Sequence, residues 1–183
     1  MRLFTIEHSQ SEYRADFVVY GAVWQFLLAY VALATPVSMR WIVVNLCVVG
    51  IAVWSLAEYV LHRFVLHGLR PFSDWHAAHH EHSIALICTP TLLSAPLILS
   101  LVFLPALALA DLWRACGLTF GMLSGYLAYT VTHHAMHHGR AGRRWLQGRK
   151  RWHAMHHAAG SGQYGVTSAI WDHVFRSSRM AQR

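Results

Sequence analysis

The sequence predicts an all-α integral membrane protein in which four transmembrane helices form two hairpins and a helical cap carries the histidines. Three observations support this fold class. Apolar residues make up 55% of the 183-residue chain. Four long stretches contain no charged side chain, and all 15 histidines lie outside these stretches. We therefore expect residues 1–183 to form a single membrane domain.

The charge-free stretches define the expected helices. They cover residues 17–35, 41–57, 83–110 and 115–132. A helix crosses the apolar core of a bilayer with about 20 residues, so each stretch predicts one crossing. The expected transmembrane helices run over residues 17–35, 41–61, 86–108 and 115–132. The alternative is a buried helical bundle in a soluble protein.

The third stretch is 28 residues long, which is more than one straight crossing needs. It contains Pro90, Pro96 and Pro105. Proline removes a helical hydrogen bond and clashes with the preceding turn. We therefore expect a bent or interrupted helix that begins with an interfacial turn.

Each predicted hairpin is followed by a polar, histidine-rich part, at residues 62–83 and 133–183. Four crossings would put both parts on the same side of the membrane. Most basic residues fall in these parts: Arg63, Arg70, Arg140, Arg143, Arg144, Arg149, Lys150 and Arg151. The two opposite turns offer only Arg40 and Arg114. Basic loops stay in the cytoplasm, so the cap is expected to be cytoplasmic. The basic run is either a topology signal or a site for acidic lipid headgroups.

Ten of the 15 histidines form four clusters with the spacing of metal ligands. These are His62 and His67; His76, His79 and His80; His133 and His137; and His153, His156 and His157. Spacings of three and four place side chains on one face of a helix. We therefore expect each triplet to aim at one point. The gap of five between the first pair corresponds to about 140° on a regular helix, which requires either a helix end between them or two different metals.

Neutral imidazole binds iron, copper, zinc and nickel well. Ten imidazoles are too many for one ion, whereas two ions with five each would leave an octahedral position open on each ion. No side chain activates oxygen by itself, and metal cofactors supply that chemistry. The clusters therefore predict a dimetal site whose open positions could take oxygen or water.

The remaining histidines are His8, His82, His134, His138 and His173. They are expected to be solvated or to support the ligands. His134 and His138 share the spacing of His133 and His137, so spacing alone leaves the choice between these pairs open. Metal-bound imidazoles usually donate their second N–H to a carboxylate or carbonyl. Glu58, Glu81 and Asp172 lie near the clusters and are candidates for this role; each is equally consistent with a cap or a surface charge.

The order of the clusters resembles the fatty acid hydroxylase and sterol desaturase superfamily, and within it the fatty acid 2-hydroxylases. The most specific part is the C-terminal stretch, where His153-x2-His156-His157 is followed by Tyr164-Gly165-Val166-Thr167-Ser168 and then by Trp171-Asp172-His173-Val174-Phe175. The resemblance covers roughly residues 40–176. It also favours His133 and His137 over their neighbours as ligands.

The resemblance implies a membrane-bound, O2-dependent lipid hydroxylase that acts on an acyl chain at C2. It implies two metal ions, expected to be iron, although zinc accepts the same ligands. The ten clustered histidines would be the ligands, and no catalytic residue beyond them is expected. The partners would be a lipid or fatty-acyl substrate, O2 and the membrane, with no nucleic acid.

Two departures from the family pattern matter. Fungal and animal 2-hydroxylases usually carry an N-terminal cytochrome b5 domain, whereas 16 residues precede the first stretch here. We therefore expect a separate electron donor of the cytochrome b5 or ferredoxin type. After His80 the chain continues with Glu81-His82-Ser83-Ile84 and lacks the family's usual proline pair, which leaves the identity of the lipid open. The expected location is the inner membrane of a bacterium or the endoplasmic reticulum of a eukaryote.

Three alternatives compete with this interpretation. A carotenoid or sterol hydroxylase or desaturase would share the histidine clusters, but the stretch from Tyr164 to Phe175 favours an acyl-chain enzyme. A membrane metal transporter or metal-binding protein would place ionisable groups in the middle of its membrane helices. A haem-binding electron carrier would place paired histidines inside the bundle. The charge-free stretches contain neither feature.

Overall fold

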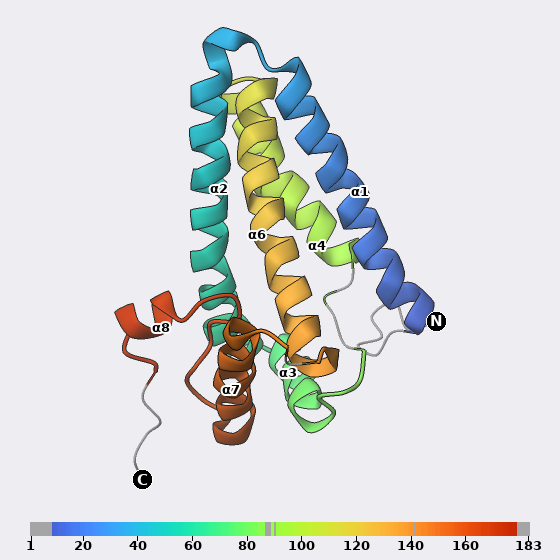
Figure 1. The fold of residues 1–183 in the computed structure, drawn as a ribbon, viewed down its shortest axis with the longest axis vertical. Helices are drawn as coiled ribbons and strands as arrows, with labels where there is room; N and C mark the ends of the chain where they lie inside the picture. Colours follow the sequence, from blue (N-terminus) through green and yellow to red (C-terminus); the bar gives the residue numbers. More distant parts are fainter. Residues whose placement is uncertain (1–8, 87–88, 90, 141, 179–183) are drawn as a thin grey trace. The chain divides into compact units, whose positions relative to one another are not determined.

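All secondary-structure elements in the described part of the chain are helical. A computed structural model describes residues 9–86, 89, 91–140 and 142–178, and within these ranges it contains no strand. The helices are α1 (Gln10–Ala34), α2 (Arg40–Val60), α3 (Phe72–Glu81), α4 (Thr91–Ile98), α5 (Leu104–Leu109), α6 (Leu112–His138), α7 (Arg144–Ala159) and α8 (Ile170–Val174). A 3-10 turn, η1 (Val37–Met39), and two π-helical segments, η2 (Leu61–Leu66) and η3 (Leu99–Phe103), complete the chain (Figure 1). The predicted all-α class is confirmed.

The chain divides into two compact units. The first unit comprises residues 1–54 and 86–127, and the second comprises residues 55–85 and 128–183. Helices α2 and α6 each contribute residues to both units. The first unit therefore contains most of the apolar helices, and the second contains all ten clustered histidines.

Three helical segments are long and apolar enough to cross a membrane: Gln10–Ala34, Val37–Leu66 and Thr91–Leu109. Many of their large apolar side chains are exposed, including Phe26 at 68%, Leu101 at 70% and Leu109 at 88%. A water-soluble domain rarely leaves so large an apolar surface uncovered. These are properties of an integral membrane protein. Helix α6, expected as the fourth crossing, is not among the segments that meet this criterion.

Helix α1 begins at Gln10, well before residue 17 where the expected crossing starts. A capping box explains the earlier start. The Ser9 hydroxyl accepts a hydrogen bond from the Glu12 backbone N–H, and the Glu12 carboxylate accepts one from the Ser9 backbone N–H. These contacts satisfy backbone donors that would otherwise be unpaired in the first turn. Helix propensity and capping therefore extend the helix into the charged part of the sequence.

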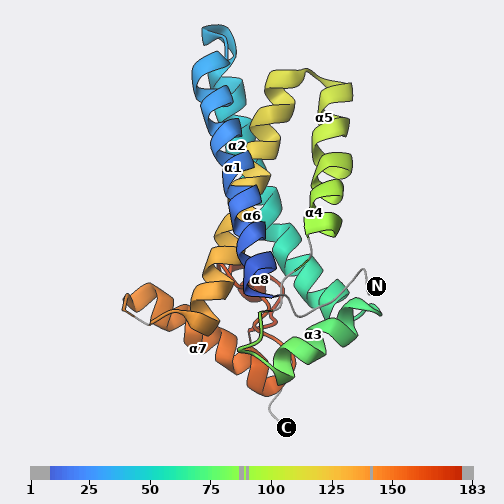
Figure 2. The ribbon, with the colours of Figure 1, turned by 90° about the vertical axis from the view of Figure 1, so that its right-hand side faces the viewer.

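The third apolar stretch is interrupted, as its prolines predict. Figure 2 shows α4 and α5 as parts of one helical run, with the π-helical segment η3 between them. Pro96 lies inside α4 and Pro105 at the start of α5. The Ser100 hydroxyl donates to the Pro96 carbonyl at 2.6 Å. The run begins at Thr91 and not at residue 86. Pro90 lies outside the described residues.

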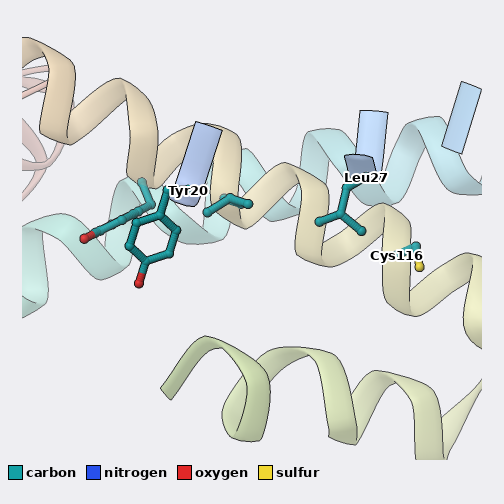
Figure 3. Close-up of a cluster of buried hydrophobic side chains, with 5 residues drawn as sticks. Tyr20, Leu27 and Cys116 are labelled. Atoms are coloured by element: carbon teal, nitrogen blue, oxygen red, sulfur yellow. The ribbon is translucent and has the colours of Figure 1, made fainter. Parts of the chain in front are cut away.

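Buried apolar side chains from α1 and α6 form the core of the first unit. This cluster consists of Tyr20, Leu27, Cys116, Leu123 and Tyr126 (Figure 3). Hydrogen bonds join the helices around it. The Tyr20 hydroxyl lies 2.6 Å from the Ser94 hydroxyl of α4, and Trp24 Nε1 donates to the Ser124 hydroxyl of α6 at 2.8 Å. Polar side chains within apolar helices thus satisfy one another.

Helices α2 and α6 approach closely along a seam of glycines. A Cβ atom added at Gly117 would lie 2.9 Å from Val43 Cγ1, and one at Gly125 would lie 2.6 Å from Trp54 Cδ1. At Gly121 it would overlap the carbonyl oxygen of Cys47. Small residues at every fourth position let two helix backbones approach in this way. The seam fixes α2 against α6 within the first unit.

Candidate metal centre

The ten clustered histidines come from four segments of the second unit: η2 with the residue after it, helix α3, the end of α6, and helix α7. Most of them gather in two groups whose ligand atoms lie within 4.8 Å of one another. The first histidine group consists of His62, His67, His76, His80 and His156. The second histidine group consists of His79, His133, His137 and His153. Each group is able to hold a metal ion.

The tenth predicted ligand, His157, is outside both groups but touches each of them. Its Nε2 atom lies 3.0 Å from Nε2 of His153, a member of the second group. Its ring stacks on that of His80, a member of the first group, with ring centroids 4.2 Å apart. All ten predicted histidines are therefore within one continuous cluster of imidazoles.

The structure contradicts the prediction that each histidine triplet aims at one point. On α3, His76 and His80 belong to the first group, whereas His79 belongs to the second. On α7, His156 belongs to the first group and His153 to the second. A turn of 3.6 residues explains the split: residues four apart stay within about 40° of each other, whereas adjacent residues differ by about 100°. Each of these two helices therefore serves both groups.

The pair His62 and His67 belongs to a single group, although it is five residues apart. The π-helical segment η2 covers residues 61–66 and makes this possible. In a π-helix hydrogen bonds connect residues five apart, so such residues stand nearly above one another. The two ring centroids are 5.3 Å apart. The π-helical segment ends at Leu66, so a helix end does lie between the two histidines, with His67 as the C-cap, and the pair does not need separate metals.

The nitrogen–nitrogen distances indicate what the groups are suited to hold. His76 Nε2 lies 3.0 Å from Nε2 of both His62 and His80. Likewise His153 Nε2 lies 2.8 Å from that of His137 and 3.0 Å from that of His157. Two ligands at right angles, each about 2.1 Å from a metal, are about 3.0 Å apart, against about 3.4 Å at a tetrahedral angle. The spacing fits an ion with right-angled ligands.

The second group also contains an unsatisfied histidine. Both ring nitrogens of His79 are buried, and neither has a hydrogen-bond partner in the described part of the chain. Burying a polar group without a partner is costly. A metal ion bound by His79, His133, His137 and His153 would satisfy one of these nitrogens. The residues therefore fit a bound cation on grounds independent of the spacing in the sequence.

Burial keeps these imidazoles neutral. Loss of solvent, reinforced by repulsion from neighbouring imidazoles, lowers the pKa of His67 and His157 to about 4 and that of His79 to about 3. Burial likewise lowers the pKa of His156 to about 4. The neutral ring has the lone pair that a metal requires. The site is therefore prepared to accept a cation at neutral pH.

A loop after α7, residues 162–167, determines how two ligands of the first group are oriented. His62 Nδ1 lies 2.5 Å from the Tyr164 carbonyl, and His156 Nδ1 lies 2.7 Å from the Gly162 carbonyl. A carbonyl accepts only from a protonated nitrogen, so each ring carries its proton on Nδ1. Each Nε2 is then left with its lone pair directed into the group.

The candidate carboxylates do not touch the imidazoles directly. Glu58 and Asp172 are 4% and 0% exposed, and both accept hydrogen bonds from the backbone of the 162–167 loop. Glu81 is exposed at the end of α3. Two of the predicted ligands, His62 and His156, instead donate their Nδ1–H groups to loop carbonyls. Sequence reasoning missed this role because any residue can supply a carbonyl.

Arg149 also differs from its predicted role. It belongs to the basic run interpreted as a topology signal or headgroup site, yet it is only 8% exposed. Its Nε donates to the Val166 carbonyl at 2.9 Å, and its guanidinium also bonds the Gly165 carbonyl. This residue is therefore a structural clamp for the loop.

The other histidines lie outside the two groups. His134 and His138 stack on each other, with ring centroids 4.9 Å apart, whereas His133 and His137 belong to the second group. His173 is exposed and packs against Trp152. His82 is exposed as well. His8 lies outside the described residues.

Residues 47–177 match the sequence profile of the family described as fatty acid hydroxylase. The matched region includes both histidine groups and the 162–167 loop. The chain belongs to the fatty acid hydroxylase family. The resemblance read from the histidine clusters is therefore confirmed.

Curated members of the fatty acid hydroxylase family share about a third of their aligned residues with this chain. A dihydroceramide fatty acyl 2-hydroxylase of Arabidopsis thaliana is 36% identical over 143 residues, covering 69% of this chain and 57% of the relative. A fatty acid 2-hydroxylase of Macaca fascicularis is 34% identical, covering 80% of this chain and 42% of the relative. The chain thus spans about half the length of these relatives.

A solved structure supports the fold. The chain described as full-length scs7p, with only its hydroxylase domain visible, superposes with a TM-score of 0.71 at 23% identity. The match covers 94% of this chain and 67% of the other. At this level of identity the likeness concerns the fold, which is that of a fatty acid hydroxylase domain.

Proposed function

We propose that this chain is a membrane-bound dimetal oxygenase that hydroxylates a lipid acyl chain, most simply at C2, next to the carbonyl carbon. The observation that carries the proposal is the gathering of imidazole Nε2 atoms into two adjacent groups, with contacts near 3.0 Å, in a chain of the fatty acid hydroxylase family. This arrangement suits two cations, which would satisfy the nitrogen lone pairs that face one another in each group.

All ten clustered histidines are proposed as ligands. The first ion would be held by His62, His67, His76, His80 and His156, and the second by His79, His133, His137, His153 and His157. His157 joins the second set because of its contact with His153. Five right-angled ligands leave one position of an octahedral ion open. Iron is the proposed metal, and zinc accepts the same ligands.

The reaction places one oxygen atom of O2 into a C–H bond and releases the other as water, which consumes two electrons and two protons. The bound metal pair would supply the activation of O2, which no side chain provides. The protein holds neutral imidazoles in place, keeps most of their surface from water, and orients His62 and His156 through the 162–167 loop. A protein donor of the cytochrome b5 or ferredoxin type is proposed for the electrons.

The substrate class is inferred from the relatives. Their names specify a dihydroceramide fatty acyl 2-hydroxylase, a ceramide very long chain fatty acid hydroxylase and a fatty acid 2-hydroxylase. Because this chain spans only 57% and 60% of the two Arabidopsis thaliana relatives, activity and substrate are proposals for it. Both a free fatty acid and an acyl chain in amide linkage are consistent with these names.

We also propose that residues 1–183 form one membrane domain with four crossings and a cytoplasmic cap. Three segments meet the length and composition criterion. Helix α6 is the proposed fourth, because it has 27 residues and is charge-free from residue 115 to 132. The proposed crossings are residues 17–35, 41–61, 91–108 and 115–132, the third starting where its helical run begins, with 62–83 and 133–183 in the cytoplasm. The membrane would be the inner membrane of a bacterium or the endoplasmic reticulum of a eukaryote.

Comparison of two adjacent histidines tests this function. His137 belongs to the second group, whereas its neighbour His138 is exposed and outside both groups. The wild type, His137→Ala and His138→Ala would be produced in cells with matched lipids and a reductase, and lipid classes compared by mass spectrometry with fragmentation. We expect 2-hydroxylated lipids from the wild type and His138→Ala, and at least a tenfold loss from His137→Ala.

Other results would redirect the proposal. Oxygen added to a ring or to a mid-chain carbon would keep the metal chemistry and contradict the C2 position. Equal lipid profiles in all three strains, with metal-loaded protein confirmed, would reject lipid hydroxylation and favour a metal-binding role.

A further inference from the structure

We propose that Glu58 and Asp172 are positioning residues for the first histidine group, acting through the peptide units of the 162–167 loop. The inference rests on the proposed function only in treating that group as a metal site. Neither carboxylate contacts a predicted metal ligand, and each acts by fixing the loop that orients His62 and His156.

The first step concerns one peptide unit. The Tyr164 carbonyl and the Gly165 N–H belong to the same trans peptide, so they point in opposite directions. The carbonyl receives His62 Nδ1 at 2.5 Å, and the N–H donates to Asp172 Oδ2 at 2.8 Å. The carboxylate thereby fixes the plane of the peptide that orients the imidazole. Its charge also polarises the peptide and makes the carbonyl a better acceptor.

The next two peptide units are fixed at both ends. The Val166 and Thr167 N–H groups donate to Glu58 Oε1 at 2.7 and 2.9 Å. On the opposite side Arg149 donates to the carbonyls of Gly165 and Val166. Three consecutive peptides thus have a carboxylate at the N–H and a donor at the carbonyl. A loop held in this way has little freedom to rotate away from His62.

The loop is tightly fitted as well as hydrogen-bonded. A Cβ atom at Gly165 would overlap the Ser168 carbonyl and lie 2.9 Å from Asp172 Oδ2. Only glycine allows the carboxylate to approach this peptide so closely. Asp172 also accepts from the Tyr164 N–H at 2.9 Å and from the Ser177 hydroxyl at 2.8 Å. The carboxylate is therefore itself held by several donors.

The second histidine group lacks an equivalent support. In the described residues, His79 Nδ1 has no hydrogen-bond partner, and the printed contacts of His137 and His153 are made through Nε2 to other imidazoles, not through Nδ1 to the loop. The two groups therefore differ in how their ligands are oriented. Loosening the loop should weaken metal binding at the first group and leave the second group nearly unchanged.

Counting bound metal tests this difference. The purified full-length chain, its Asp172→Asn variant and its Glu58→Gln variant would be titrated with Zn²⁺, a metal without redox chemistry. Asp172→Asn places an NH2 group against a backbone N–H donor in either orientation of the amide, because both carboxylate oxygens accept from the backbone. Glu58→Gln removes the negative charge to which the Val166 and Thr167 N–H groups and the Thr167 hydroxyl donate. We expect two tightly bound Zn²⁺ ions in the wild type. In each variant we expect one of the two to bind about 10–100 times more weakly.

Matched controls separate positioning from a general loss of structure. Glu81→Gln changes an exposed carboxylate next to His80 and should bind both ions as the wild type does. Far-ultraviolet circular dichroism should show unchanged helix content in all variants. His62→Ala should lose the same ion as Asp172→Asn, which identifies the affected group.

The results that would overturn the inference differ from those that would overturn the function. Full affinity for both ions in Asp172→Asn and Glu58→Gln would reject a positioning role, and so would loss of both ions together with helix content. Absence of any tightly bound Zn²⁺ in the wild type, or no effect of His62→Ala and His137→Ala, would instead reject the proposed dimetal function.

Discussion

His156 has no exposed surface, and the histidines around it share its neutral state. In the folded chain the pKa of His67, His156 and His157 is held near 4, against 6.5 for an unperturbed imidazole. Between these values the unfolded chain binds protons that the folded chain does not. The contribution of these residues to stability is therefore complete above about pH 6.5 and is lost as the pH falls through 4.

The metal-free protein should accordingly become less stable as the pH is lowered from 7 to 4. Chemical denaturation at a series of pH values measures this, and a His156→Ala variant should show a shallower dependence. Added Zn²⁺ should raise the stability most at neutral pH, because protons compete for the same nitrogens. A stability that is constant from pH 7 to 4 would contradict the neutral, buried state of these rings.

At the scale of residues, the sequence predicted which histidines gather but not how they divide. Spacing and family resemblance selected all ten, and nine fall in the two groups while His157 touches both. The division of each triplet depends on which other segments lie on the two sides of its helix. Spacing along one helix gives no information about these neighbouring segments. The role of the Tyr164 carbonyl was equally hidden, because backbone atoms carry no side-chain signature.

At the scale of elements, the charge-free stretches predicted where the apolar helices lie. The ends of these helices depend instead on local features such as capping, which the apolar pattern does not contain. Helix α1 begins with a capping box before the apolar stretch. The gap from His62 to His67 was interpreted with α-helical geometry, whereas the chain forms a π-helical segment there. Such segments are short local departures from the α-helix and are frequent at functional sites. A regular helical period could not have predicted this one.

The glycine seam between α2 and α6 appears in the sequence as Gly117, Gly121 and Gly125, which are four residues apart. It leads to a prediction at the scale of elements. Gly121→Ala would push a methyl group into the Cys47 carbonyl and should destabilise the protein by about 1–3 kcal/mol. The change should appear as a lower midpoint of thermal unfolding in detergent.

A glycine elsewhere provides the control. Nothing lies within 4 Å of a Cβ atom added at Gly21 of α1. Alanine favours helix over glycine by about 1 kcal/mol, so Gly21→Ala should leave the stability unchanged or raise it. If both substitutions had the same effect, close packing along the seam would not be the reason for the glycines at α6.

At the scale of the whole molecule, the number of crossings decides which face of the membrane the histidines occupy. Four crossings put residues 36–40 on one side and the chain's C-terminal residues on the other. Reporter fusions that are active on only one side of the membrane would distinguish these positions. We expect a cytoplasmic signal at residue 183 and an external signal at residue 38, whereas three crossings would place residues 62–83 and 183 on opposite sides.

The burial of the ligands has a further consequence for how a metal enters and leaves. His62, His79, His153 and His156 are between 0% and 4% exposed. A buried ion can exchange only when part of the surrounding structure opens transiently. Release into a strong chelator should therefore reach a rate that no longer rises with chelator concentration. That limiting rate would measure the opening of the protein itself, and the same opening would limit how fast the folded chain takes up its ions.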